Sequence, residues 1–201
     1  IRKLNTQGQR NATAASGQTR VDKVIYQDPA FKRHDTFGFM YRLPEVAAAL
    51  GLAQIEKVDW FVRKREQMAA MYREVLEGSA LLQIQKTPAG DRNSYYAFAA
   101  RFISEEITWY EFRDTYREFG GDGIYAAWAL CYEEDVIPEI KEILTSIGLE
   151  NRFNTEQGIC PQAELIQPQL MQFTTNQKDE NEMREQAEAL KKTLAWFTGK
   201  K

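Results

Sequence analysis

Residues 37–76 read FGFMYRLPEVAAALGLAQIEKVDWFVRKREQMAAMYREVL, and this stretch decides the fold of the chain. It opens with a glycine-containing turn, 38–42, and then changes to sequence that is typical of a helix. Pro44 suits the first helical position, where its missing N–H costs nothing, and the charge of Glu45 in the first turn favours the helix dipole. The stretch therefore predicts a turn that leads directly into helical structure.

The helical pattern of this stretch has two parts. Gly51 costs about 1 kcal/mol inside a helix relative to alanine, so we expect a short helix, a bend, and then a long helix over 53–76. Apolar residues recur there in steps of three and four, which predicts one apolar stripe opposite a charged face. The stripe consists of Ile55, Val58, Val62, Met68, Ala69, Tyr72, Val75 and Leu76.

The same stretch carries a resemblance to a known family. The residues concerned are Gly38, Phe39, Tyr41, Arg42, Glu45, Ala48, Ala49, Gly51, Leu52, Gln54, Ile55, Asp59, Arg65, Ala69, Tyr72 and Leu76. On these residues the chain is similar to the DegT/StrS family, the sugar aminotransferases that depend on pyridoxal 5′-phosphate (PLP). Agreement at so many spaced positions is more specific than a single short motif. The sequence departs from the family at Met40, where the family has asparagine.

The resemblance implies the C-terminal half of an enzyme with the type I PLP-transferase fold, an α/β fold. By this resemblance, residues 1–42 are the loop-rich end of a large domain, 43–77 are linking helices, and 78–201 form a small C-terminal α+β domain. The chain starts at Ile1 rather than methionine, so we expect a fragment whose missing part holds the PLP lysine.

No catalytic residue is therefore assigned to this chain. The Schiff-base lysine of the family is expected upstream, because Lys23 and Lys32 do not lie in the family's lysine context. The sequence does not contain the loop that would carry this lysine, so it leaves open which residue occupies that position.

The pattern of residues 78–201 separately predicts an α+β structure. We expect a small antiparallel sheet with helices on one face. The expected strands are 81–85, 95–103 and 124–128, and the expected helices are 109–119, with Thr108 as its N-cap, and 181–197. Upstream, weak alternation over 21–26 predicts a short strand.

The resemblance also implies the activity and the partners of the complete enzyme. Such enzymes transfer an amino group from an amino acid, glutamate in most members, to a nucleotide-linked keto-sugar. In the family homodimer, the loop that corresponds to 37–42 reaches into the neighbouring subunit's active site.

Five residues are candidates for binding cofactor or substrate. The guanidinium group of Arg42 could bind a phosphate of the cofactor or of the substrate through two hydrogen bonds. Met40 occupies the family's phosphate-binding asparagine position, but a thioether is only a weak acceptor. Tyr41, Tyr125 and Trp128 could stack on a sugar or a nucleotide, although aromatic residues in strands are more often part of the core.

Composition and charge exclude several other classes of function. A net charge of -3 and a pI near 5.4 argue against a nucleic-acid partner. No stretch approaches the roughly 20 apolar residues of a membrane span, so we expect a cytoplasmic protein. His34 is the only histidine, which excludes sites that need two, and we expect it in a loop. The acidic run 133–135 lacks convergent partners in the sequence, so we expect neither a metal site nor buried charge there.

Two further functions stay open at this point. A family relative in which the lysine is replaced would dehydrate a sugar instead of aminating it. A non-catalytic dimerisation and substrate-wall domain would act only with its other half. The residue at the lysine position of the missing loop would separate the three.

Overall fold

The computed structural model describes residues 3–5, 7–10, 22–40, 45–150 and 154–199, and it divides the chain into two units. We call residues 1–48 and 127–168 the loop unit, and residues 49–126 and 169–201 the sheet unit. Each unit is described by itself.

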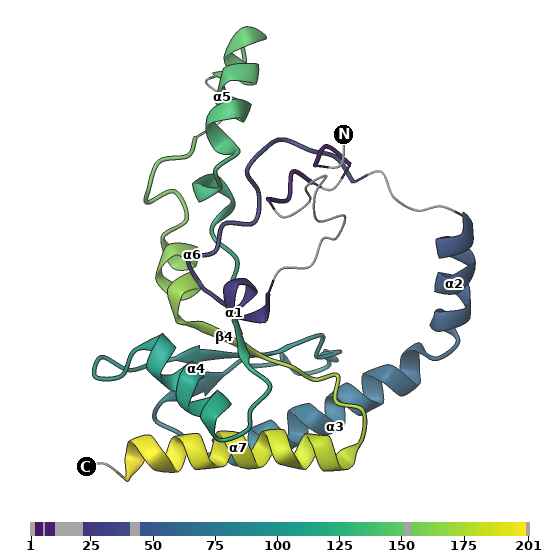
Figure 1. Ribbon diagram of the computed structural model, residues 1–201, viewed down its shortest axis with the longest axis vertical. Coiled ribbons are helices and arrows are strands. Elements are labelled where there is room, and N and C mark those ends of the chain that lie inside the picture. Colours follow the sequence, from purple (N-terminus) through teal and green to yellow (C-terminus); the bar gives the residue numbers. More distant parts are fainter. Residues whose placement is uncertain (1–2, 6, 11–21, 41–44, 151–153, 200–201) are drawn as a thin grey trace. The chain divides into compact units, whose positions relative to one another are not determined.

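The sheet unit contains a four-stranded antiparallel sheet in the order β1-β2-β4-β3. Figure 1 labels the strand β4 of this sheet. The strands are β1 (Leu82–Ile84), β2 (Phe98–Phe102), β3 (Ile124–Ala126) and β4 (Leu170–Phe173). Three of them lie inside the strands predicted from the sequence. The α+β class is therefore confirmed.

The central strand β4 was not predicted. It has only four residues, and glutamines and Pro168 surround it, so its own sequence carries little strand signal. It forms because it has a partner on each side: Phe173 is paired with Phe98 of β2 and with Ile124 of β3. This pairing is a long-range property that a local pattern does not contain.

Three helices cover one face of the sheet, as predicted. They are α3 (Val58–Leu76), α4 (Trp109–Glu118) and α7 (Glu180–Thr198). Their aromatic side chains pack on the buried phenylalanines of the sheet in the pairs Tyr72–Phe98 (5.3 Å between ring centroids), Tyr72–Phe173 (5.4 Å), Tyr116–Phe173 (5.6 Å) and Phe102–Phe112 (5.2 Å). The core of the unit therefore lies between this face and the helices.

The start of α4 confirms the predicted cap. The hydroxyl of Thr108 accepts a hydrogen bond from Glu111 N, and the Glu111 carboxylate accepts one from Thr108 N. This reciprocal pair satisfies two backbone donors that the helix leaves open. Helix α7 begins similarly, because the carboxylate of Asp179 accepts from Asn181 N and Glu182 N.

The predicted bend lies later in the chain than expected. Gly51 is inside α2 (Glu45–Ile55), and the helix breaks at residues 56–57 instead. The predicted stripe is also buried only in its second half. Met68, Ala69, Tyr72 and Leu76 are buried against the sheet, whereas Ile55 and Val58 are exposed.

The loop unit contains short helices. They are α1 (Lys23–Tyr26), the 3-10 helix η1 (Cys131–Glu133), α5 (Ile137–Ser146) and α6 (Pro161–Ile166). The strand predicted over 21–26 is wrong, because the Asp22 carboxylate accepts a hydrogen bond from Val24 N and thereby caps α1. Within the described part of the chain, no helix combines the length and the apolar character that crossing a membrane requires.

Candidate functional site

Backbone hydrogen bonds join two segments of the loop unit. The first segment is residues 3–10, of which residue 6 is not described, and the second is residues 33–39. The bonds run from Arg10 N to Arg33 O (2.7 Å), from Asp35 N to Gly8 O (3.1 Å) and from Phe39 N to Leu4 O (2.5 Å). We call these segments the paired segments. They fix the backbone directly before Met40, the first of the predicted site residues.

Glycines allow this close pairing. Gly8 has φ +70°, and a Cβ atom there would lie 1.5 Å from Thr36 O. A Cβ atom at Gly38 would lie 2.3 Å from Gly8 N. Real Cβ atoms do not approach backbone atoms so closely, so both positions require glycine for this conformation.

An ion pair also joins the paired segments. The amine of Lys3 donates hydrogen bonds to both carboxylate oxygens of Asp35, at 2.8 and 2.6 Å. The sequence pattern did not predict this role of Lys3.

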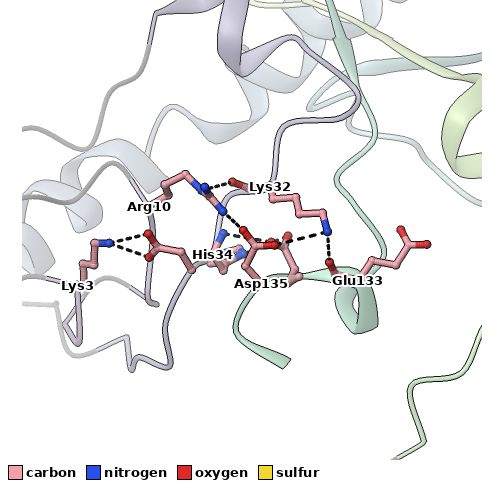
Figure 2. Close-up of polar contacts among 8 residues, drawn as sticks. Lys3, Arg10, Lys32, His34, Glu133 and Asp135 are labelled. Carbon is pink, nitrogen blue, oxygen red and sulfur yellow. Dashed lines mark hydrogen bonds and ion pairs between the residues drawn. The ribbon is translucent and has the colours of Figure 1, made fainter. Parts of the chain in front are cut away.

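Acidic residues of 133–139 bind both paired segments and the neighbouring Lys32, and Figure 2 shows the contacts of 133–135. The contacts are Lys32 Nζ to Glu133 O (2.8 Å) and Asp135 (3.5 Å), Arg10 to Asp135, His34 N to Glu134 Oε2 (3.2 Å), and His34 Nδ1 to Glu134 Oε1 (3.3 Å). Thr36 Oγ1 and Phe37 N both donate to Glu139 Oε2, at 3.0 and 3.1 Å. The expectation of solvated charge is therefore wrong for Glu134, which is buried with His34 as its partner.

Arg33 lies in an aromatic cage. Its side chain is buried, and its guanidinium carbon is 4.9 Å from the ring centroid of Tyr26, 4.8 Å from that of Trp128 and 5.8 Å from that of Phe31. Its Nε atom has no hydrogen-bond partner among the described residues. The three rings therefore stabilise a buried cation through their π faces.

The structure places the predicted site residues in different surroundings. Met40 is 59% exposed. Tyr41 and Arg42 lie outside the described residues. Tyr125 is half-buried on β3 in the sheet unit, and Trp128 belongs to the loop unit, where its ring contacts Arg33 and His34.

A tyrosine–carboxylate pair connects η1 with α6. The Tyr132 hydroxyl donates to Glu164 Oε1 (2.6 Å), and Gly158 N donates to the same oxygen (2.8 Å). These two hydrogen bonds hold the pKa of Glu164 below its ordinary value, and the bond from Tyr132 has the larger effect. The pKa of Tyr132 is raised by desolvation and by the nearby carboxylate. Glu164 is therefore an acceptor at neutral pH and not a proton donor.

PLP is the cofactor that the resemblance implies, and its phosphate group needs a binding site on the protein. A phosphate requires donors, such as backbone N–H groups or charged side chains. Met40, at the implied phosphate position, offers a thioether and is exposed. This residue does not fit the group.

Comparisons with known proteins give relatives of one kind. The chain is 28% identical over 100 residues to a GDP-perosamine synthase of Escherichia coli O157:H7, which covers 47% of this chain and 27% of the relative. It is 35% identical over 63 residues to a GDP-perosamine synthase of Vibrio cholerae, which covers 31% of this chain and 17% of the relative. The chain thus spans less than a third of the length of these curated relatives.

Solved structures share the fold. Helicobacter pylori PseC, an aminotransferase involved in the biosynthesis of pseudoaminic acid, matches with a TM-score of 0.53 and 18% identity, over 97% of this chain and 45% of that one. DesV of S. venezuelae, in complex with a ketimine intermediate, matches with a TM-score of 0.56 and 18% identity, over 84% and 41%.

A sequence model of one family matches residues 1–120, which is more than half of the 201 residues. The match includes the turn and helices from which the resemblance was inferred. The chain belongs to the DegT/DnrJ/EryC1/StrS aminotransferase family.

Proposed function

We propose that the complete protein transfers an amino group from an amino acid, glutamate in the first instance, to a nucleotide-linked keto-sugar. The observation that carries this proposal is the family match over residues 1–120. The GDP-perosamine synthases among the relatives support a nucleotide-linked sugar as the substrate. PLP is the cofactor that the family indicates, and it supplies the amino-transfer chemistry when bound. We place the enzyme in the cytoplasm.

The domain boundaries and the site belong to the same proposal. Residues 1–42 are the loop-rich end of the large domain, residues 43–77 are the linking helices, and residues 78–201 form the small C-terminal domain. In the site, Arg42 binds a phosphate of the cofactor or the substrate. Tyr41 lines the substrate site with Tyr125 and Trp128.

One observation favours a second candidate function. Met40 is exposed and cannot donate a hydrogen bond to the cofactor phosphate. A non-catalytic domain that dimerises and forms a wall of the substrate site would not need that bond. Such a domain would act only together with a partner that carries the PLP lysine.

An assay of the complete protein tests the catalytic proposal. With PLP and glutamate, wild-type protein should convert a nucleotide-linked keto-sugar to its amino form. Arg42→Ala removes a charge-assisted contact worth about 1.5–3 kcal/mol, so kcat/KM should fall by about 10- to 150-fold. The melting temperature should stay unchanged.

Arg63→Ala, an exposed arginine of α3, is the matched control and should keep full activity. Reduction with borohydride and peptide mapping should find the PLP-bearing lysine outside the 201 residues. Stoichiometric labelling of Lys3, Lys23 or Lys32 would contradict that assignment. If the wild-type protein did not transfer amino groups, the catalytic proposal would be wrong and the non-catalytic domain would be the remaining candidate function.

The proposed homodimer predicts the mass of the chain in solution. The end of α2 and the start of α3 expose a run of large apolar side chains: Leu50, Leu52, Ile55, Val58, Trp60 and Phe61. Proteins that expose apolar patches larger than roughly a few hundred Å² tend to associate through them. We expect light scattering at micromolar concentration to give a dimeric mass and Leu52→Asp to give a monomer. Leu165→Asp, at an exposed leucine of α6 that is not part of this run, should leave the dimer intact. A wild-type monomer would refute the proposal.

A further inference from the structure

Glu139 holds the backbone that leads into the proposed cofactor and substrate loop. It lies in the first turn of α5, a hundred residues away in sequence from its partners. One carboxylate oxygen, Oε2, accepts both the Thr36 hydroxyl (3.0 Å) and Phe37 N (3.1 Å). A single side chain therefore restrains two consecutive residues.

These bonds complete a series of contacts along the second paired segment. Asp35 N is bound to Gly8 O, and Phe39 N is bound to Leu4 O, both on the N-terminal segment. Phe37 N lies between them and has the Glu139 carboxylate as its acceptor. The backbone is thus bonded at residues 35, 37 and 39, directly before Met40.

Charge strengthens the contact at residue 37. A hydrogen bond to an ionised group is about twice as strong as one between neutral groups. The contact is exposed, so the loss of Glu139 would not leave a buried donor without a partner. Its removal should therefore loosen the segment without unfolding the unit.

From this geometry we infer that Glu139 is a positioning residue for the backbone of residues 36–40, which precedes the proposed ligand-binding residues Tyr41 and Arg42. By binding Thr36 and Phe37, it sets the direction in which the backbone approaches Met40. The inference rests on the proposed function, because that function gives the loop its ligand. Glu139 itself does not touch the ligand.

Amide hydrogen exchange on the 201-residue chain tests the clamp independently of any activity. Glu139→Ala should speed exchange at Phe37 by about tenfold, the equivalent of one lost charge-assisted hydrogen bond. Glu139→Gln keeps an acceptor oxygen and should restore most of the protection. Glu142→Ala removes an exposed carboxylate one turn later in α5 and should leave Phe37 unchanged.

An unchanged Phe37 amide in Glu139→Ala would overturn the clamp. Faster exchange throughout the loop unit would also overturn it, because Glu139 would then act on general stability.

The same variants in the complete protein test the positioning role. Glu139→Ala should raise KM for the nucleotide-linked sugar severalfold with a smaller change in kcat, and Glu139→Gln should restore KM. Equal kinetics in all variants, alongside a loosened Phe37, would refute positioning. A wild-type protein without activity would refute the proposed function and with it the positioning role, while the exchange result on the clamp would stand.

Discussion

Replacing Phe173 with alanine should lower the free energy of unfolding of the sheet unit by about 3–5 kcal/mol. The ring is fully buried at the end of β4. It packs on Tyr72 at 5.4 Å, on Tyr116 at 5.6 Å and on Phe98 at 6.4 Å between centroids. The truncation therefore opens a cavity where two helices and two strands meet. Urea denaturation followed by circular dichroism would measure the loss.

Tyr96→Ala is the matched aromatic control for this experiment. Tyr96 belongs to the same unit but is 85% exposed. Its truncation leaves no cavity, so the free energy of unfolding should change by less than about 1 kcal/mol. If the two variants had equal stability, Phe173 would not be a core residue and the central place of β4 would be in question.

Gly8→Ala should separate the paired segments of the loop unit. Two effects add: a non-glycine residue at φ +70° is strained by about 1–3 kcal/mol, and its Cβ would lie 1.5 Å from Thr36 O. Neither atom can rotate away, because Cβ is fixed directly on the Cα atom and Thr36 O belongs to the backbone. We expect exchange at the amides of Asp35 and Phe39 to rise by about 100-fold or more, which corresponds to about 2.8 kcal/mol.

Gly148→Ala separates strain from collision. Gly148 has nearly the same φ, +71°, and belongs to the same unit, but a Cβ there would meet nothing within 4 Å. Its substitution should cost only the backbone strain and leave the amides of Asp35 and Phe39 protected. If Gly8→Ala behaved like Gly148→Ala, the paired segments would not have the close approach that the structure shows.

Much of the sheet unit could be predicted because its signals are local. Thr108 and Glu111 have the spacing of a capping box, and α4 begins there. The aromatic run within 95–103 predicted a buried strand, and β2 lies inside it. Cap chemistry and apolar periodicity depend on neighbours in sequence, so the sequence alone contains them.

The remaining features depend on partners that lie far away in sequence. β4 requires β2 and β3 on either side. The break between α2 and α3 is an exception, because there a local rule gave the wrong position: α2 tolerates Gly51 in its interior. No periodicity links Glu139 to Thr36 or Glu134 to His34, so the acidic residues that hold the loop unit could not be recognised.

The strand order of the sheet also constrains when it can be completed during synthesis. β2 and β3 are not neighbours, because the last strand, β4, lies between them. Until residue 173 has left the ribosome, both strands present unpaired N–H and C=O groups along these edges, and such edges pair readily with other chains. The nascent chain therefore passes through a stage at which these edges are unpaired, and we expect a product that ends before β4 to be prone to aggregation.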